Sequence, residues 1–259
     1  MANYIYDGTF EGLLTAIYEA YYLGNPPENI FPHHYVQEHF LCENIQITTC
    51  TEKADKVYDA ISKKISSYAL RHTYYAFLSE KQDISTYIYH YLKMGFKVGK
   101  NIDRYLTDDN VRFVHDISRK VGFERHRMLG LLRFRQVSMD DYYATFEPDY
   151  NITALLAPHF TKRLSDQNWI IHDVKRNIGA IYKKNTKKWI VSDVSFKQPL
   201  GNNSQEKLFQ EMWKTYFDNI AIEARQNAKL QRQFMPQRYW KHLIEKNIAA
   251  QPPKTSGEF

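Results

Sequence analysis

One short stretch, residues 121–135, holds many of the side chains whose types and spacing could do chemistry. It carries four arginines, one histidine and one glutamate among large apolar residues. Planar guanidinium groups bind phosphate and carboxylate oxygens through paired hydrogen bonds, so several in one segment are typical of an anion site. Glu124 and His126 stand beside these arginines and could serve acid–base chemistry. The alternative for this pair is a set of hydrogen bonds at a helix terminus.

Arg133 and Arg135 are the most informative pair in this stretch. The hydrophobic pattern changes from helical to alternating near Leu129, which predicts a strand over residues 129–137. Side chains two residues apart in a strand point to the same side, so the two guanidinium groups would repel each other unless an anion lay between them. Either a phosphate or an acid on a neighbouring strand, such as Glu147, could be that anion.

A second polar cluster follows further along the chain. His159 and Arg163 lie one turn apart on a predicted helix, and His172, Asp173 and Arg176 follow in and after a predicted strand. His172 and the adjacent Asp173 point to opposite faces of that strand, so they are not a ready catalytic pair. Each of these residues could also be a satisfied structural residue. The sequence contains no GxSxG, Walker, GxGxxG or HExxH pattern.

The composition is that of a globular protein with a basic middle. Of 259 residues, 43% are apolar and 25% are charged, which excludes wholesale disorder. The net charge is +6, and residues 60–135 hold fifteen Lys and Arg against seven Asp and Glu. Such a surplus attracts polyanions, although Lys-rich solvated helices would produce the same count. Twenty Tyr and fifteen Phe supply rings for the core or for stacking of unpaired bases.

Cysteine usage and the absence of apolar segments indicate a cytoplasmic protein with reduced thiols. Cys42 and Cys50 are too few and too irregularly spaced for a disulfide framework. His33, His34 and His39 lie near Cys42 but do not supply four convergent ligands, so we expect a surface loop and no metal site. The first residues do not resemble a signal peptide, and no stretch reaches the length of a membrane span, so we expect no membrane association.

The hydrophobic periodicity predicts an α+β fold with an antiparallel central sheet, helices before it and a helical C-terminal cap. A strand at 4–6 is followed by a turn and a helix from Phe10 to Tyr21, and residues 25–43 are expected to be irregular. A strand at 45–49 follows, and Thr49 and Glu52 form a capping-box pattern that opens the next helix. The other expected helices cover residues 83–94, a segment from Thr107 or Asp108, 152–164 and 208–224, with a short one from Pro236. The other expected strands are 129–137, 142–147, 169–174, 178–183 and 189–194.

We expect one domain over residues 1–245. Its parts are a strand–helix and helical part at 1–122, an antiparallel sheet part at 123–196 and C-terminal helices at 203–245. A linker lies near 198–203, and residues 246–259 form a Pro-, Ser- and Gly-rich tail that we expect to be disordered.

Several of these segments together resemble a bacterial family of DNA metabolism proteins whose domain has no known function. The matching segments are 6–16, 124–127 running to 133–134, 156–160 with Arg163, 171–173 with Arg176, 225–231 and 235–240. The last one, Met-Pro-Gln-Arg-Tyr-Trp, is the most specific, and the resemblance extends to about residue 245. Where the family pattern usually reads Asn-Pro-Lys, this chain has Asn-Ala-Lys at 227–229.

The resemblance implies a role in DNA repair or modification beside a radical-SAM protein similar to DNA photoproduct lyases. In some chains the family domain is joined to one resembling uracil-DNA glycosylases. This chain lacks the CxxxCxxC pattern of a radical-SAM enzyme. We therefore expect no cofactor in this chain, with the iron–sulfur cluster and S-adenosylmethionine only in the partner.

Three hypotheses follow: a DNA-binding accessory protein with a radical-SAM partner, a nucleic-acid- or nucleotide-processing enzyme, and a protein–protein scaffold. The candidate catalytic residues are Glu124, His126, His159 and His172. The candidate nucleic-acid-binding residues are Arg127, Arg133, Arg135, Arg163, Arg176, Arg225, Lys229, Arg238, Tyr239 and Trp240.

Overall fold

The computed structural model describes residues 2–22, 26–35, 43–195, 204–220 and 227–246, and it divides into two compact units, 1–123 and 124–259. Unit 1 contains β1 (Ala2–Tyr6), α1 (Phe10–Tyr22), β2 (Asn29–Pro32), η1 (His33–Tyr35), β3 (Glu43–Gln46), α2 (Thr51–Ala60), η2 (Ile61–Ile65), α3 (Ser67–Phe77), α4 (Ile84–Val98), η3 (Gly99–Arg104) and most of α5 (Asp109–Leu131). Unit 2 contains the end of α5, β4 (Arg135–Ser138), β5 (Asp141–Phe146), α6 (Thr153–Arg163), β6 (Asn168–Asp173), β7 (Ile178–Lys183), β8 (Lys188–Asp193), α7 (Ser204–Asn219), α8 (Ala228–Phe234), η5 (Gln237–His242) and η6 (Ile244–Lys246).

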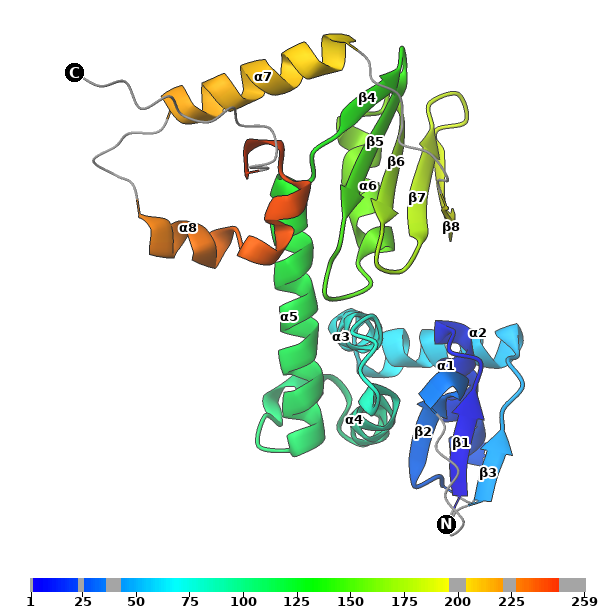
Figure 1. Cartoon of the computed structure of the whole chain (residues 1–259). Coiled ribbons are helices and arrows are strands. Elements are labelled where there is room, and N and C mark those ends of the chain that lie inside the picture. Colours follow the sequence, from blue (N-terminus) through cyan, green and yellow to red (C-terminus); the bar gives the residue numbers. More distant parts are fainter. Residues whose placement is uncertain (1, 23–25, 36–42, 196–203, 221–226, 247–259) are drawn as a thin grey trace, which may run out of the picture. The chain divides into compact units, whose positions relative to one another are not determined.

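Unit 1 begins with a parallel three-stranded sheet in the order β2-β1-β3 (Figure 1). The predicted strand, turn and helix are confirmed. Gly8 has a φ of +88°, which suits glycine, and Thr9 Oγ1 accepts the N–H of Gly12 at the start of α1. The prediction of irregular structure over residues 25–43 was wrong at β2, a four-residue edge strand. Residues 36–42, including His39 and Cys42, lie outside the described residues.

Four helical segments, α2, η2, α3 and α4, follow this sheet. The predicted capping box was wrong, because Thr49 donates its hydroxyl to Asp7 Oδ2 at 2.8 Å and α2 begins at Thr51 without a side-chain cap. The buried Ile61 and Ile65 confirm the predicted apolar face. A Cβ at Gly95 would lie 2.7 Å from Ile65 Cδ1, so α4 approaches η2 closely there. Helix α3 was not predicted.

Helix α5 is longer than the sequence pattern indicated. Asp108 begins it as predicted, since its carboxylate accepts the N–H groups of Asn110 and Val111. The helix continues to Leu131, so the strand predicted from Leu129 was wrong in its first half. Strand β4 starts only at Arg135 and leaves Arg133 in the connection.

Unit 2 is built on a five-stranded sheet in the order β4-β5-β6-β7-β8 (Figure 1). The predicted strands in this part are present, and the hairpin turn before Lys188 is confirmed by the bond from Lys187 N–H to Lys183 O. The α+β class is confirmed, but the sheet is mixed, because β5 and β6 are parallel. Helix α6 lies between these strands in sequence, and a crossover of this length permits parallel pairing.

One face of this sheet carries the core of unit 2. Helix α6 packs against β6, β7 and β8. Trp169 is 1% exposed and stacks on Tyr182 with ring centroids 5.2 Å apart, while Phe134 and Phe160 meet its edge. The opposite face is therefore the one that can present polar side chains.

The C-terminal segments confirm the predicted helices in part. Helix α7 matches the beginning of the predicted 208–224 helix, and η5 begins directly after Pro236. The apolar side chains of α7 are not buried: Leu208, Phe209, Met212 and Tyr216, and Ile220 directly after the helix, are each at least 55% exposed. The predicted linker, residues 221–226 and the tail from 247 lie outside the described residues.

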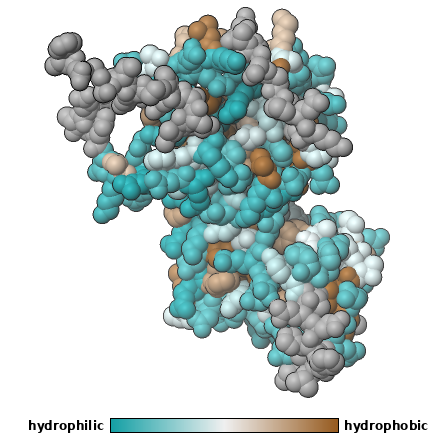
Figure 2. All heavy atoms as spheres, viewed as in Figure 1, coloured by the Kyte–Doolittle hydropathy of each residue, from teal (hydrophilic) through white to brown (hydrophobic). Residues whose placement is uncertain are grey.

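The visible surface is mostly hydrophilic, with hydrophobic residues in small separate areas (Figure 2). Within the described segments, every helix is too short or too polar to cross a membrane.

Candidate functional site

Arg133, predicted to hold phosphate, is paired inside unit 2. Its Nη2 lies 2.6 Å from Glu245 Oε1 and its Nε lies 3.2 Å from Oε2 of the same carboxylate. The guanidinium also covers the ring of Trp213 at 5.3 Å, and the indole N–H of Trp213 donates to Glu245. Burial acts to raise the pKa of Glu245, but the hydrogen bonds from Arg133, Trp213 and the backbone, together with the charge of Arg133, outweigh it, and the pKa is lowered. An acid is therefore the partner, and it is Glu245 rather than Glu147.

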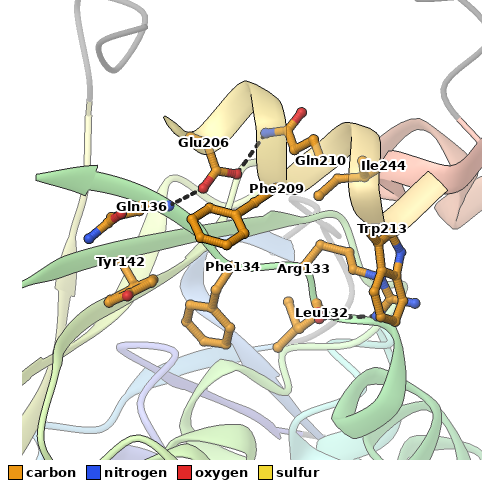
Figure 3. Close-up of a pocket in the computed structure, with 10 residues that line it drawn as sticks. All are labelled: Leu132, Arg133, Phe134, Gln136, Tyr142, Glu206, Phe209, Gln210, Trp213 and Ile244. Carbon is orange, nitrogen blue, oxygen red and sulfur yellow. Dashed lines mark hydrogen bonds between the residues drawn. The ribbon is translucent and has the colours of Figure 1, made fainter. Parts of the chain in front are cut away.

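A groove of about 460 Å³ opens beside this ion pair (Figure 3). Helix α7 forms one wall through Phe209 and Trp213, and Phe134 and Tyr142 from the sheet side face them. Glu206 joins α7 to β4, because its carboxylate accepts the backbone N–H of Gln136 at 3.0 Å. The same carboxylate accepts the side-chain amide of Gln210 at 2.7 Å. The groove thus offers aromatic faces with one neutralised cation, a lining that suits a flat, partly apolar group.

Arg135 begins a polar group on the sheet face opposite α6. Side chains of Arg135, Tyr143 and His172 share this face, since Arg135 pairs with Tyr143 and His172 pairs with Thr145. The hydroxyl of Tyr143 lies 2.6 Å from His172 Nδ1, and Thr145 Oγ1 lies 3.1 Å from His242 Nδ1. We name Arg135, Tyr143, Thr145, His172 and His242 the sheet-face cluster.

The two histidines of the sheet-face cluster are held in the neutral form. Burial lowers the pKa of His172, although Asp173 acts in the opposite direction. Burial also lowers the pKa of His242, and Glu147 only partly offsets this effect. Neutral imidazoles can accept a proton or bind a ligand group, and the exposed Arg135 adds a positive charge at their edge.

Glu124, a candidate catalytic residue, lies in a saturated network. It is 2% exposed and accepts the backbone N–H groups of Asp149 at 2.8 Å and Tyr150 at 2.9 Å, as well as the hydroxyl of Tyr239. Arg238 donates to that hydroxyl at 3.0 Å and pairs with the carboxylate of Asp149 at 2.9 Å. This arrangement ties the C-terminal block to the end of α5 and engages both Glu124 oxygens.

His126 and His159 lie apart from this network. His126 is exposed, and two residues along a helix it does not share a face with Glu124. His159 is half-buried on α6 and its ring meets the adjacent Phe160 edge-on at 5.0 Å. The structure therefore gives Glu124 and His172 different partners and leaves His126 at the surface.

The predicted nucleic-acid-binding residues fall into two groups. Arg133, Arg176, Arg238, Tyr239 and Trp240 are engaged inside unit 2. Arg176, for example, donates to Asp173 at 2.8 Å and to the carbonyl of Asp149 at 2.9 Å, and Trp240 donates to the carbonyl of Met235. Within the described residues, no ion pair forms at Arg127, Arg135, Arg163 or Lys229. Arg225 lies outside the described residues.

Unit 1 carries a basic surface that the sequence indicated only through its surplus of Lys and Arg over Asp and Glu. Lys64 of η2, Lys97 at the end of α4, and Lys100 and Arg104 of η3 are exposed on segments that pack together. A Cβ at Gly99 would lie 3.6 Å from the carbonyl oxygen of Lys64, which places these segments side by side. None of the four pairs with an acid in the described part of the chain, whereas the neighbouring Lys63 pairs with Asp59. We name these four residues the basic corner.

Comparison with known proteins identifies a family but no activity. Residues 82–245 match a family model described as a domain of unknown function, DUF4130. A search of curated proteins finds no match to the chain.

Proposed function

Because the chain belongs to the DUF4130 family, whose description gives no activity, we propose a function from its surface chemistry: a DNA-binding accessory protein in DNA repair or modification. It acts with a radical-SAM partner, which carries the iron–sulfur cluster, S-adenosylmethionine and the reaction. The partner comes from the family resemblance of the sequence, whereas DNA binding also has support in the structure.

The basic corner is the observation that carries this proposal. Lys64, Lys97 and Lys100 extend from three adjoining segments and have no acidic partner among the described residues. Lysines in this arrangement act as point charges for phosphates and release the counterions of the nucleic acid on binding. In this proposal the corner binds the backbone without reading sequence.

The aromatic groove of unit 2 supports a second kind of contact. Phe209 lies near Tyr142 and Trp213 lies at the other end of the groove beside Arg133, and unpaired bases stack on such rings. Arg135 remains a candidate phosphate contact on the neighbouring sheet face. We propose that the groove takes an unstacked base, while Arg133 serves to position Trp213.

Helix α7 also supplies a surface for the partner. Leu208 and Met212 are each 57% exposed and lie one turn apart on this helix. Exposed apolar side chains in a row are typical of protein interfaces. We propose that they contact the radical-SAM protein. The scaffold hypothesis rests on the same exposed apolar side chains, so it is compatible with this contact.

The test measures fluorescence anisotropy of labelled single- and double-stranded DNA at two salt concentrations. The triple variant Lys64→Ala, Lys97→Ala and Lys100→Ala is compared with wild type. Its charge-matched control is Lys175→Ala, Lys183→Ala and Lys188→Ala, three exposed lysines of unit 2. For double-stranded DNA, each lost phosphate contact lowers the slope of log K against log salt by about 0.9, so we expect a drop of about 2–3 only in the basic-corner variant.

Equal binding by wild type and the basic-corner variant would contradict the proposal, as would an equal loss in the control. Absence of DNA binding by wild type would favour the scaffold hypothesis. The next measurement would then be capture of the radical-SAM protein by wild type and by a Leu208→Ser, Met212→Ser variant.

The enzyme hypothesis has its best support in the sheet-face cluster. His172 and His242 are neutral imidazoles near Arg135, which suits proton transfer to or from a phosphate ester. Glu124 is less suited to this role because its oxygens are already engaged. Turnover of a nucleic acid or nucleotide by the purified chain, lost in His172→Gln, would favour this alternative over the accessory role.

A further inference from the structure

Three potential metal ligands from three separate helical segments converge inside unit 1. His72 comes from α3, Asp103 from η3 and His115 from α5, and one ligand atom of each lies within 4.8 Å of the others. Across the described residues, this is the one group of at least three His, Cys, Asp or Glu side chains that meets this condition. From this convergence we propose that unit 1 binds one divalent first-row transition-metal ion through His72, Asp103 and His115.

The three side chains already lie close together. His115 Nε2 lies 3.1 Å from Asp103 Oδ1, and the rings of His72 and His115 stack with centroids 4.2 Å apart and planes inclined by 26°. An ion with ligand bonds of about 2.0–2.2 Å would draw the three ligand atoms closer together. Because the two imidazole planes are nearly parallel, their nitrogen lone pairs do not yet meet at one point, so binding also requires one ring to turn about its Cβ–Cγ bond.

A second layer of hydrogen bonds supports the ligands. Ser118 Oγ lies 2.9 Å from His72 Nδ1, and Tyr91 donates its hydroxyl to Asp103 Oδ1 at 3.3 Å. Ser118 is 4% exposed and Tyr91 is fully buried, so both are fixed by the surrounding helices. Hydrogen bonds of this kind hold ligating imidazoles and carboxylates in orientation and strengthen metal binding.

The ligand set selects the class of ion. Two imidazoles and one carboxylate suit Zn²⁺, Fe²⁺, Co²⁺ or Ni²⁺, whereas Ca²⁺ and Mg²⁺ prefer oxygen ligands throughout. The side chains of His115 and Asp103 are 19% and 32% exposed, which gives an ion access to the site.

Three protein ligands leave at least one coordination position for water or an outside group. The site is therefore of the open type, in contrast to structural zinc sites with four protein ligands. Asp103 lies on η3 together with Lys100 and Arg104 of the basic corner. Metal binding itself does not depend on the DNA-binding proposal, and its test uses no nucleic acid.

A metal-free polar network is the competing explanation for the same contacts. The bonds of Asp103 to Tyr91 and His115, and of His72 to Ser118, could simply join the three helices. The two explanations differ in one measurable property, which is saturable uptake of one ion per chain.

The experiment titrates the purified, chelator-treated full chain with Co²⁺ and then with Zn²⁺. We expect one Co²⁺ per chain, with visible absorption bands that one equivalent of Zn²⁺ removes. Asp103→Asn and His115→Gln should each abolish saturable uptake, and Ser118→Ala should weaken it about tenfold. The control His33→Gln, His34→Gln removes the histidine pair of η1 and should leave uptake unchanged.

A readout on wild type alone guards against variants that fail to fold. Bound Co²⁺ should broaden the imidazole NMR signals of His72 and His115 more strongly than those of the other histidines. Lack of saturable uptake by wild type would overturn the proposal. Uptake that persists in both ligand variants, or broadening confined to other histidines, would overturn it equally.

Discussion

The hydroxyl of Tyr239 donates a hydrogen bond to Glu124, although the two residues are 115 positions apart. The same carboxylate accepts the N–H groups of Asp149 and Tyr150, so one buried acid joins the end of α5, the loop after β5 and η5. The segment with the most specific family resemblance, 235–240, thus has an architectural role in unit 2. The resemblance of this segment to the family does not by itself indicate a contact with DNA.

Replacing Tyr239 by Phe tests this architectural role. The change removes one of three donors to a buried carboxylate, so the free energy of unfolding should fall by about 1–3 kcal/mol. Urea unfolding measures the difference. Tyr68→Phe, at a ring that is 62% exposed, is the control and should change stability by less than about 0.5 kcal/mol. Unchanged stability together with weaker DNA binding would instead support direct contact of Tyr239 with nucleic acid.

The ion pair between Glu245 and Arg133 should make stability depend on pH. The pKa of Glu245 is below its usual 4.5 in the folded chain, because its hydrogen bonds and the charge of Arg133 together outweigh the opposing effect of burial. A lowered carboxyl pKa stabilises the fold above the unfolded pKa, and this contribution is lost as the pH falls through the folded pKa. Glu245→Gln should therefore cost about 1.5–3 kcal/mol at pH 7. The difference from wild type should shrink once the pH falls below 4.5.

Urea unfolding at several pH values measures this difference. Glu211→Gln, an exposed acid on α7, provides the control and should not reproduce the trend. A cost that stays constant down to low pH would show that Glu245 acts through packing and not through its charge.

We expect Arg133 to stabilise the fold and Arg135 to act only at the surface. Arg133→Ala leaves Glu245 without its cation, so it should lower stability by about 3 kcal/mol or more. Arg135→Ala should leave stability within about 0.5 kcal/mol, because Arg135 is exposed. If Arg135 contacts a phosphate, its loss should reduce the salt slope of DNA binding by about 1. Lys188→Ala is the charge-matched control in the anisotropy measurement. A similar decrease of the salt slope in this control would contradict a phosphate contact of Arg135.

Phe209→Ala tests base stacking in the groove. Phe209 lines the groove and is 59% exposed, so its removal should change folding little. If an unpaired base stacks there, affinity for single-stranded DNA should fall by about 1–3 kcal/mol, with a smaller effect on double-stranded DNA. Leu208→Ala alters the adjacent exposed residue, which does not line the groove, and should change neither affinity. An equal loss for both forms of DNA would contradict stacking.

Hydrophobic periodicity predicted the helices and strands that have one buried face and one exposed face. The strands from β5 to β8, and helices α1, α4 and α6, have apolar residues at regular spacing and were found. Strand β2 was missed because it is short and ends in Pro32, which is tolerated at a sheet edge. The strand predicted from Leu129 failed because the helical bonding continues to Leu132, whose N–H bonds to Met128 O, and both side chains are buried at a helical spacing of four.

The site was harder to predict because its pairs are distant in sequence. Arg133 and Glu245 are 112 positions apart, so no local spacing could distinguish the acid from a phosphate as the arginine's partner. His72, Asp103 and His115 lie in three separate helical segments and form no short motif. Sequence patterns identified the residue types that could act as ligands or cations, and tertiary packing decided which of them met.

The parallel pairing of β5 with β6 has a consequence for the order of folding. Strands β4 and β5, and likewise β6, β7 and β8, pair through short antiparallel connections that close quickly. Strand β5 can pair with β6 only after the crossover through α6 has formed, so we expect this to be the last pair of strands in the sheet to form. The hydrogen bond between Tyr143 and His172 joins these two strands. Its formation during refolding would therefore mark the moment at which two separately formed half-sheets become one.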